Sequence, residues 1–172
     1  VRVNEEGKTS WNVTLGGEEV EDKLFSALKV HDGFVFVGLT HSLGGDSEVW
    51  IVKIDVNGNK IWDKTMGSNS YDRLTCVIES SEGGFLLGGF SAAGISGDKT
   101  EPSKGSDDYW VIKIDANGNK QWDKTFGGSS TDALTSIIET NEGGFLLGGH
   151  SRSDISGQKT ESSKGGNDFW IV

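Results

Sequence analysis

Several residue types that usually carry structural or catalytic information are scarce in this sequence. Among 172 residues there is one cysteine, Cys76, so no disulfide can form within the chain, and we expect this thiol to be a small core residue. A single proline stands beside 26 glycines, a balance that indicates a turn-rich β protein rather than a helical one. No apolar run approaches the length of a membrane-spanning helix, so we expect no insertion into a membrane.

Basic residues and catalytic motifs are scarce as well. The formal net charge is −10 and the isoelectric point is about 4.7, so phosphates would be repelled and we expect no nucleic-acid partner. The patterns CxxC, HExxH and GxSxG and a phosphate-binding glycine loop are all absent. His31, His41 and His150 occupy unrelated positions without a partner at a fixed spacing. The sequence therefore favours a protein without catalysis and without a cofactor, although it leaves an enzyme possible.

The dominant feature that is present is an internal repeat. Trp50 and Trp110 open the nearly identical stretches WIVKIDVNGNKIWDKT and WVIKIDANGNKQWDKT, and Trp170 begins a third copy. The two copies share about 38 of 60 positions, a period in the range of propeller blades or solenoid coils. We treat residues 1–172 as a single repeat region with the periods 1–51, 52–111 and 112–171.

Each period contains four short apolar stretches separated by glycine, asparagine and aspartate, which predicts an all-β fold. The segments Asn141–Gly144 and Asn117–Asn119 predict tight hairpin turns, because asparagine and glycine tolerate the positive φ that such turns require. Four antiparallel strands per repeated unit are typical of a β-propeller blade.

The repeat pattern DxWIVKIDxNGNxxWxKTFGG, followed by SIIET and GGFLLGG, resembles the repeats of bacterial secreted or cell-surface β-propeller proteins. The stretch from WVIKID to QW is also similar to Trp-bearing repeats of quinoprotein-type propellers. The resemblance implies a secreted or cell-surface location and a strand order with LTSIIET innermost, GFLLGGHS second, DFWIV third and KQWDKTF outermost. On this order we expect the inner-strand residues Leu28, Ile78 and Ile138 to be buried. The first repeat departs from the pattern by a loop nine residues shorter after its second strand.

Three periods are too few for an ordinary closed propeller, and the chain starts and ends within a third strand. We expect neither end to be a natural domain boundary. The unfinished third strands are expected to find a partner, because strand edges carry unpaired backbone groups. That partner is the chain's own other end across a distorted ring, a second copy that completes six blades, or further sequence of a longer protein.

The long loops after the second strands are the first candidate for a binding site. They span residues 92–108 and 152–168, and both copies keep ISG, KTE and SKG apart from one Pro-to-Ser change, so we expect them to be ordered. Long loops on one face of a rigid scaffold commonly bind ligands, here a carbohydrate or a protein, although a purely decorative role is the alternative. The acidic candidates in these loops are Asp98, Glu101, Asp107, Asp108, Glu161 and Asp168.

A second candidate is the aspartate that precedes each inner strand, namely Asp22, Asp72 and Asp132. These carboxylates could form a ring around a central channel and bind a cation or a sugar hydroxyl. The alternative, which we favour, is that each accepts hydrogen bonds from backbone amides of its own loop, since structural roles recur in every repeat.

Other repeated polar residues are expected to be structural. Asp55, Asn57 and Asn59 resemble the start of a calcium loop, but the downstream bidentate carboxylate is missing, so we expect a hairpin turn and no metal. The six tryptophans fall at repeat positions and are expected to pack between blades. Lys53 beside Asp63, and Lys113 beside Asp123, predict cross-strand charge pairs.

Three function classes are compatible with these features. The one we favour is a non-catalytic, extracellular β-propeller module that binds a ligand or serves as a scaffold. The second is part of a polysaccharide-active or quinone-dependent propeller enzyme, and the third is a self-assembling structural unit. The near-identity of the second and third repeats argues against the enzyme, because active sites usually use residues found in one repeat only.

Overall fold

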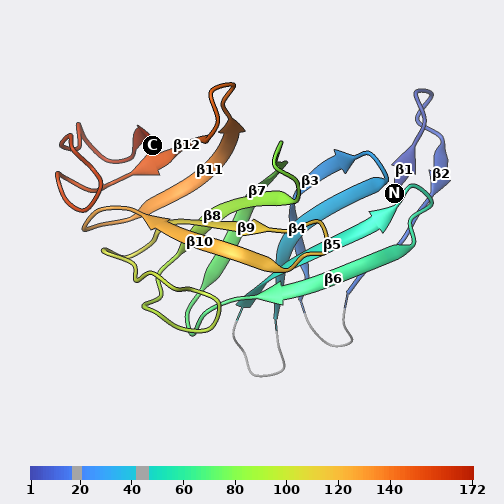
Figure 1. Cartoon of the computed structure of the whole chain (residues 1–172), viewed down its shortest axis with the longest axis horizontal. Coiled ribbons are helices and arrows are strands. Elements are labelled where there is room, and N and C mark those ends of the chain that lie inside the picture. The colour runs from blue at the N-terminus through green and yellow to red at the C-terminus, as the bar shows by residue number, and fades with distance from the viewer. Residues whose placement is uncertain (17–20, 42–46) are drawn as a thin grey trace.

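The computed structural model describes residues 1–16, 21–41 and 47–172, and its regular structure consists of antiparallel β-strands (Figure 1). These ranges contain no helix, and hence none that is long and apolar enough to cross a membrane. The prediction of an all-β chain is confirmed for the described residues. The shortened loop of the first repeat falls largely at residues 42–46, outside them.

Two four-stranded sheets form the middle of the molecule, and in each the strands follow one another in chain order. The first sheet contains β3 (Lys23–Val30), β4 (Gly33–His41), β5 (Ser47–Asp55) and β6 (Lys60–Met66). The second contains β7 (Asp72–Glu79), β8 (Phe85–Ser91), β9 (Asp108–Ile114) and β10 (Lys120–Phe126). Both agree with the expected succession of four strands per repeat.

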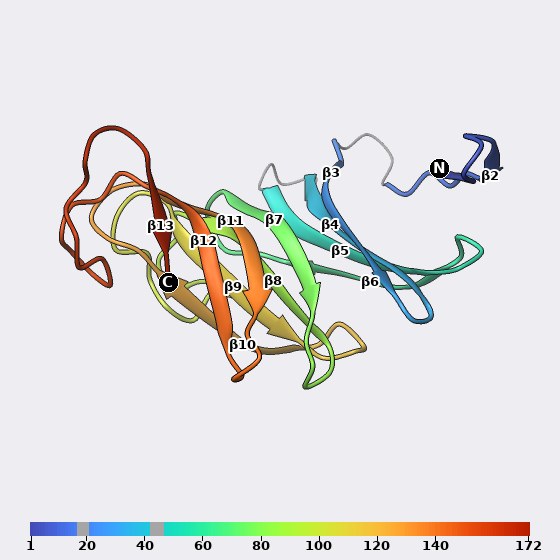
Figure 2. The same cartoon turned by 90° about the horizontal axis from the view of Figure 1, so that it is seen from above.

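Smaller sheets lie at the two ends of the chain. Three strands form the last sheet, β11 (Asp132–Glu139), β12 (Phe145–Ser151) and β13 (Asp168–Ile171), and two form the first, β1 (Arg2–Val3) and β2 (Thr9–Trp11). Among the described residues β1 pairs only with β2, and β13 pairs only with β12. The option that the chain's own ends join in one blade is therefore wrong, because the sheets β3–β6 and β7–β10 stand between them (Figure 2).

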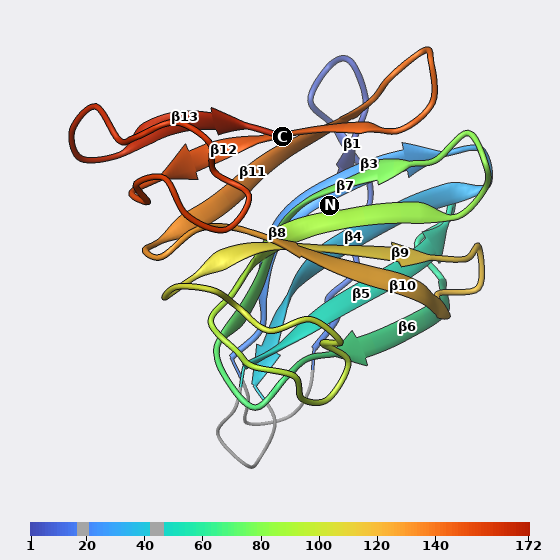
Figure 3. The same ribbon diagram turned by 60° about the vertical axis from the view of Figure 1, so that its left-hand side comes forward.

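Neighbouring sheets pack face to face in chain order (Figure 3). One buried cluster joins β3–β6 to β7–β10 and includes Val37, Ile51, Leu87 and Trp110. A second joins β7–β10 to β11–β13 and contains Leu86, Tyr109, Val111, Leu134, Ile137 and Leu147. The first strands of the sheets also lie next to one another, since β7 contacts β3 on one side and β11 on the other. The first strands β3, β7 and β11, which we call the inner strands, thus form one line across the sheets.

The burial expected for the inner strands is wrong for Ile138, which is 59% exposed, and Ile78 and Leu28 are only partly buried. A β-bulge in each inner strand interrupts the strict alternation of side chains, and no described sheet follows β11–β13 to cover Ile138 as β11–β13 covers Ile78. In β11 the register shifts between Leu134 and Ser136, so Ile137 shares the buried face with Leu134 and Ile138 points to the opposite face.

The hairpins between third and fourth strands are confirmed as tight turns. In the third repeat Asp115 Oδ1 accepts bonds from the amides of Asn117 and Asn119 at 2.8 Å, and Gly118 has a φ of 81°. In the first repeat Asn4 Oδ1 does the same for Glu6 and Lys8. The carboxamide of Asn4 therefore replaces the aspartate, which explains how NEEGK forms the same turn as DxNGN.

Candidate functional site

The aspartates that precede the inner strands close loops of their own chain. Asp72 Oδ2 accepts bonds from the amide of Ser68 at 2.6 Å and from its hydroxyl at 2.7 Å. Asp132 Oδ2 accepts the amide of Gly128 at 2.7 Å and the hydroxyl of Ser153 at 2.9 Å. Both residues are wholly buried. The interpretation as backbone acceptors is confirmed for these two through Oδ2, while Oδ1 of each carboxylate is buried without a hydrogen-bond partner among the described residues.

The aspartates at the start of the third strands use the same device. Asp108 Oδ2 accepts the backbone amide of Lys104, and Asp168 Oδ2 accepts that of Lys164 at 2.7 Å. In all four cases the donor lies four residues before the aspartate, at the entry of the strand. A carboxylate placed there satisfies amides that no strand pairs, and so fixes the loop that leads into the strand.

The long loop of the second repeat lies along the outer strand β10. Thr100 donates its amide and its hydroxyl to the Asp123 carboxylate, at 3.0 and 2.7 Å. Glu101 binds Lys124 Nζ at 2.6 Å and accepts the amide of Thr125 at 2.9 Å. The KTE segment of the loop (99–101) therefore forms hydrogen bonds with the DKT segment of the strand (123–125). By this match the loop covers a sheet edge that would otherwise expose unpaired groups.

A buried lysine stands at the centre of this contact. Lys99 is 1% exposed, donates from Nζ to Thr125 Oγ1 at 2.5 Å, and lies 5.8 Å from the Trp110 ring centre. Burial lowers the pKa of Lys99, against the opposing effect of Asp108 and Asp123. The ammonium and the surrounding carboxylates thus offset each other inside the molecule.

The same loop also contacts the loop that enters the inner strand. Asp98 Oδ2 accepts the Gly67 amide at 3.1 Å, while the Asp98 amide donates to the Gly67 carbonyl at 2.7 Å. Gln158 makes the equivalent pair of bonds with Gly127 in the next repeat, at 3.1 Å each. Loops after second and fourth strands therefore share one face, and hydrogen bonds to backbone groups hold them together.

The remaining acidic candidates differ in their surroundings. The Asp107 carbonyl accepts the Asp132 amide at 2.6 Å, and burial raises the pKa of the Asp107 carboxyl. Glu161 is exposed on the loop of the third repeat. Asp22 is half-buried beside an apolar pocket and has its own interactions.

Two of the candidate carboxylates, Asp108 and Asp132, lie close enough for an electrostatic effect. Burial raises the pKa of Asp108 to about 6, and the nearby Asp132 adds to this rise. Asp168 has a lowered pKa instead, because it accepts the Lys164 amide and the Ser163 hydroxyl without being covered by another sheet. Within residues 1–16, 21–41 and 47–172, no three histidine, cysteine, aspartate or glutamate side chains converge as a metal site would require.

The predicted cross-strand charge pairs are wrong. Lys53 Nζ binds Asp32 at 2.8 Å, and Lys113 Nζ donates to the Gly83 carbonyl. Asp63 and Asp123 instead pair with lysines on their own strands, Lys60 at 3.0 Å and Lys120 at 2.7 Å. The lysines of the third strands point toward the turn after the inner strand, which puts the outer-strand aspartates out of their reach.

The outer-strand aspartates have a different role that the sequence did not reveal. Asp123 accepts the indole N–H of Trp110 at 3.0 Å, and Asp63 accepts that of Trp50 at 3.2 Å. Burial alone would raise the pKa of Asp123, but bonds from Lys120, Thr100 and Trp110 outweigh it and lower the pKa to about 2. The recurrence of both KTE and DKT in the sequence is the pattern from which this cluster, and the role of Lys99 in it, could have been predicted.

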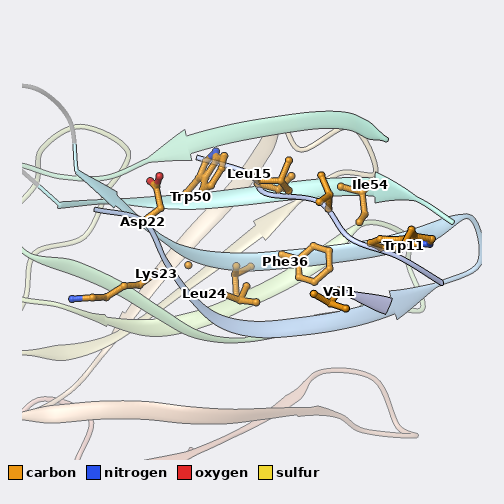
Figure 4. Close-up of a pocket in the computed structure, with 13 residues that line it drawn as sticks. Val1, Trp11, Leu15, Asp22, Lys23, Leu24, Phe36, Trp50 and Ile54 are labelled. Atoms are coloured by element: carbon orange, nitrogen blue, oxygen red, sulfur yellow. The ribbon is translucent and has the colours of Figure 1, made fainter. Parts of the chain in front are cut away.

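An apolar pocket of about 380 Å³ lies on the first four-stranded sheet, under the N-terminal segment (Figure 4). Trp11 and Leu15 of that segment line one side, and Phe36 and Trp50 of the sheet line another. Asp22 and Lys23 are the charged residues of its wall. A pocket of this kind offers apolar surface and few polar groups, so it suits packing better than acid–base chemistry.

The chain is similar over most of its length to a small part of a bacterial regulatory protein. No protein-family model matches the sequence. The regulatory protein FlaEY of Caulobacter vibrioides is 26% identical to this chain over 132 residues, which is 74% of the chain. The matched region is 14% of the length of that relative.

Proposed function

We propose that this chain is a non-catalytic binding and scaffold module, built of propeller-type blades, from a bacterial secreted or cell-surface protein. The observation that carries the proposal is the use of the repeated carboxylates. Asp72, Asp132, Asp108 and Asp168 each accept an amide of the residue four positions earlier. Side chains that accept backbone amides in this way fix the conformation of surface loops, which is a structural role rather than a catalytic one.

The arrangement of the sheets supports propeller-type blades. Sequential antiparallel sheets that share a line of inner strands, and pack through their faces, resemble successive blades around an axis. The similarity to part of a bacterial protein whose name describes a regulatory role is compatible with a binding function. The location outside the cell rests on the resemblance of the repeat pattern.

A direct test compares the chain with the variant Asp108→Asn/Asp132→Asn in two activity assays. One measures reducing ends released from a panel of polysaccharides, and the other measures dye reduction with an added quinone cofactor. We expect both proteins to give the background rate. Turnover by the native chain that disappears in the folded double variant would contradict the proposal and favour the propeller enzyme.

A glycan array then separates ligand binding from a scaffold role. Binding of a defined sugar that is lost on substitution in the loops 92–107 or 152–167 would make the module a lectin-like binder. An array without signal would favour the scaffold role, in which the partner is a protein surface. Self-assembly is a candidate for that role, because one face of β11–β13 is exposed and apolar.

A further inference from the structure

Each sheet has two faces, which we call forward when it points to the next sheet in chain order and backward when it points to the previous one. The forward face of β3–β6, with Val37 and Ile51, packs on the backward face of β7–β10, with Leu87 and Trp110. The forward face of β7–β10 packs in the same way on the backward face of β11–β13. Both interfaces inside the chain therefore join a forward face to a backward face.

The forward face of β11–β13 has no such neighbour in the described structure. Its Leu146, Phe169 and Ile171 are 44%, 96% and 64% exposed. The residues at the same repeat positions in β7–β10 are Leu86, Tyr109 and Val111, and these are 0%, 0% and 2% exposed. A methyl group added at Gly148 would meet nothing within 4 Å, whereas one added at Gly88 would touch Leu134 and Ile137. A face built for burial is thus left open to water.

The backward face of β3–β6 is incompletely covered in turn. Leu24 is 61% exposed and Phe36 and Trp50 are half-buried, whereas their counterparts Leu74, Leu87 and Trp110 are fully buried. These residues line the pocket of about 380 Å³ (Figure 4). The pocket therefore occupies the position at which, elsewhere in the chain, a preceding sheet packs.

The N-terminal hairpin already stands where the outer part of that preceding sheet would be. Trp11 Nε1 donates to the Val56 carbonyl at 3.1 Å, and Trp62 Nε1 donates to the Ala116 carbonyl at 3.2 Å. Trp11 also packs against Gly58 as Trp62 packs against Gly118. By this equivalence β2 is an outer strand and β1 the end of a third strand, and among the described residues no first or second strand lies beside the hairpin.

We propose that the partner of these surfaces is a second copy of this chain. The forward face of β11–β13 packs on the backward face of β3–β6 of the second copy. In the completed sheet β13 forms the first part of the third strand, and β1 and β2 of the second copy supply the rest of that strand and the outer strand. The same contact made in both directions gives a ring of six four-stranded sheets. This inference rests on the propeller-type arrangement within the proposed function and names its partner.

The third long loop fits the same partner. Lys99, Thr100 and Glu101 bind β10, but the corresponding Lys159, Thr160 and Glu161 have no outer strand of their own sheet among the described residues. In the second copy, Asn12 and Thr14 stand at the positions of Asp123 and Thr125. They offer a carboxamide oxygen to Thr160, and a hydroxyl and an amide to Lys159 and Glu161.

Light scattering on the purified chain over a range of concentrations up to about 100 μM tests the pairing. We expect a mass of twice 18.4 kDa. Phe169→Asp on the forward face and Leu24→Asp on the backward face should each weaken association at least about 30-fold, as expected for central interface residues. Both side chains are largely exposed in the single chain, so the variants should keep the β-type circular dichroism spectrum.

A matched control and a mixing experiment sharpen the result. Ile155→Asp should leave the mass unchanged, because Ile95 at the same repeat position stays 69% exposed although its sheet has both neighbours. A mixture of Phe169→Asp and Leu24→Asp retains one intact forward face and one intact backward face. The mixture should form a 1:1 complex at concentrations at which neither variant associates alone.

Each contrary outcome is distinct. A chain that stays monomeric at all concentrations, or a dimer that Phe169→Asp leaves unchanged, overturns the pairing, as does a mixture that fails to associate. Species larger than two copies overturn the six-sheet ring. None of these results bears on the activity assays, so failure of the pairing is distinguishable from failure of the non-catalytic function.

Discussion

At the scale of single residues, one device recurs at the entry of the strands. An aspartate at or near the first strand position accepts the amide of the residue four positions earlier, and it does so at Asp72, Asp108, Asp132 and Asp168. Because an ionised carboxylate accepts such bonds more strongly than a neutral group, each loop gains a defined shape from one side chain. This explains why the aspartates recur in successive repeats.

Asp132 provides the first prediction. Replacement by alanine leaves the Gly128 amide and the Ser153 hydroxyl without their acceptor in a buried place, so we expect a loss of about 1 to 3 kcal/mol in the free energy of unfolding. Asp132→Asn keeps an acceptor oxygen and should lose less. Urea unfolding measures both, with Glu161→Ala, an exposed site, as the control within about 0.5 kcal/mol. Equal losses for alanine and asparagine would contradict this role.

Asp108 provides a prediction about pH. Its folded-state pKa is raised to about 6, above the value of an exposed aspartate, so the folded state binds more protons than the unfolded state between about pH 4 and 6. The contribution of Asp108 to stability is therefore present below pH 4 and is lost as the pH rises to 6. Between pH 4 and 6 the free energy of unfolding of Asp108→Asn should therefore fall by about 1 to 3 kcal/mol less than that of the native chain. Urea unfolding across that range measures both.

Asp123 serves as the internal reference for that experiment. Its pKa is lowered to about 2, so its contribution is present above pH 4 and is lost only at lower pH. The two aspartates thus act in different pH windows. A native chain and an Asp108→Asn variant with parallel stability profiles from pH 4 to 6 would show that Asp108 does not titrate as the structure indicates.

The residue scale is also where the sequence was least informative. The hairpin aspartates could be predicted, because their acceptors and donors lie within four residues of each other. The burial of Lys99 could not be predicted. It requires that the loop fold back over β10 and that Asp72, Asp108 and Asp123, from three different strands, surround the ammonium. Lysine is almost never fully buried unless it is paired, so composition alone argues against such a site.

At the scale of elements, strand number and order were predictable, whereas the facing of the inner strands was not. Turn residues and apolar stretches are local signals, and the second and third repeats place them at the same intervals. A bulge leaves no comparable signal. Thr75, the extra residue in β7, donates its hydroxyl to the Leu134 carbonyl of the next inner strand at 2.7 Å. The bulge therefore serves contact between sheets, which the period-2 pattern cannot reveal.

The bulge in β11 predicts different stability effects for substitutions at two neighbouring residues, Ile137 and Ile138. Ile137→Ala should lower the free energy of unfolding by about 2 to 5 kcal/mol, because Ile137 is buried between two sheets. Ile138→Ala should change it by about 0.5 kcal/mol or less in dilute protein, because Ile138 is 59% exposed. Urea unfolding at low protein concentration measures both. The reverse order of effects would place the bulge elsewhere.

At the scale of the whole molecule, stability and association are linked. If copies pair through the exposed faces, the folded chain is stabilised by mass action, and the melting temperature rises with protein concentration. For a chain of this size we expect a rise of about 2 °C for each tenfold increase in concentration. Phe169→Asp should make the melting temperature independent of concentration, and Ile155→Asp should not. Differential scanning calorimetry over a hundredfold range provides the measurement.

The charge of the molecule decides how that association responds to salt. Each copy carries a formal charge of −10, so pairing brings like charges together, while the contacting residues Leu24, Leu146, Phe169 and Ile171 are apolar. Raising the ionic strength from about 0.01 M to 1 M shortens the screening length from about 30 Å to 3 Å. The dissociation constant should therefore fall as salt is added. An assembly held mainly by ion pairs would weaken instead, and that result would mean that the exposed apolar faces are not what joins the copies.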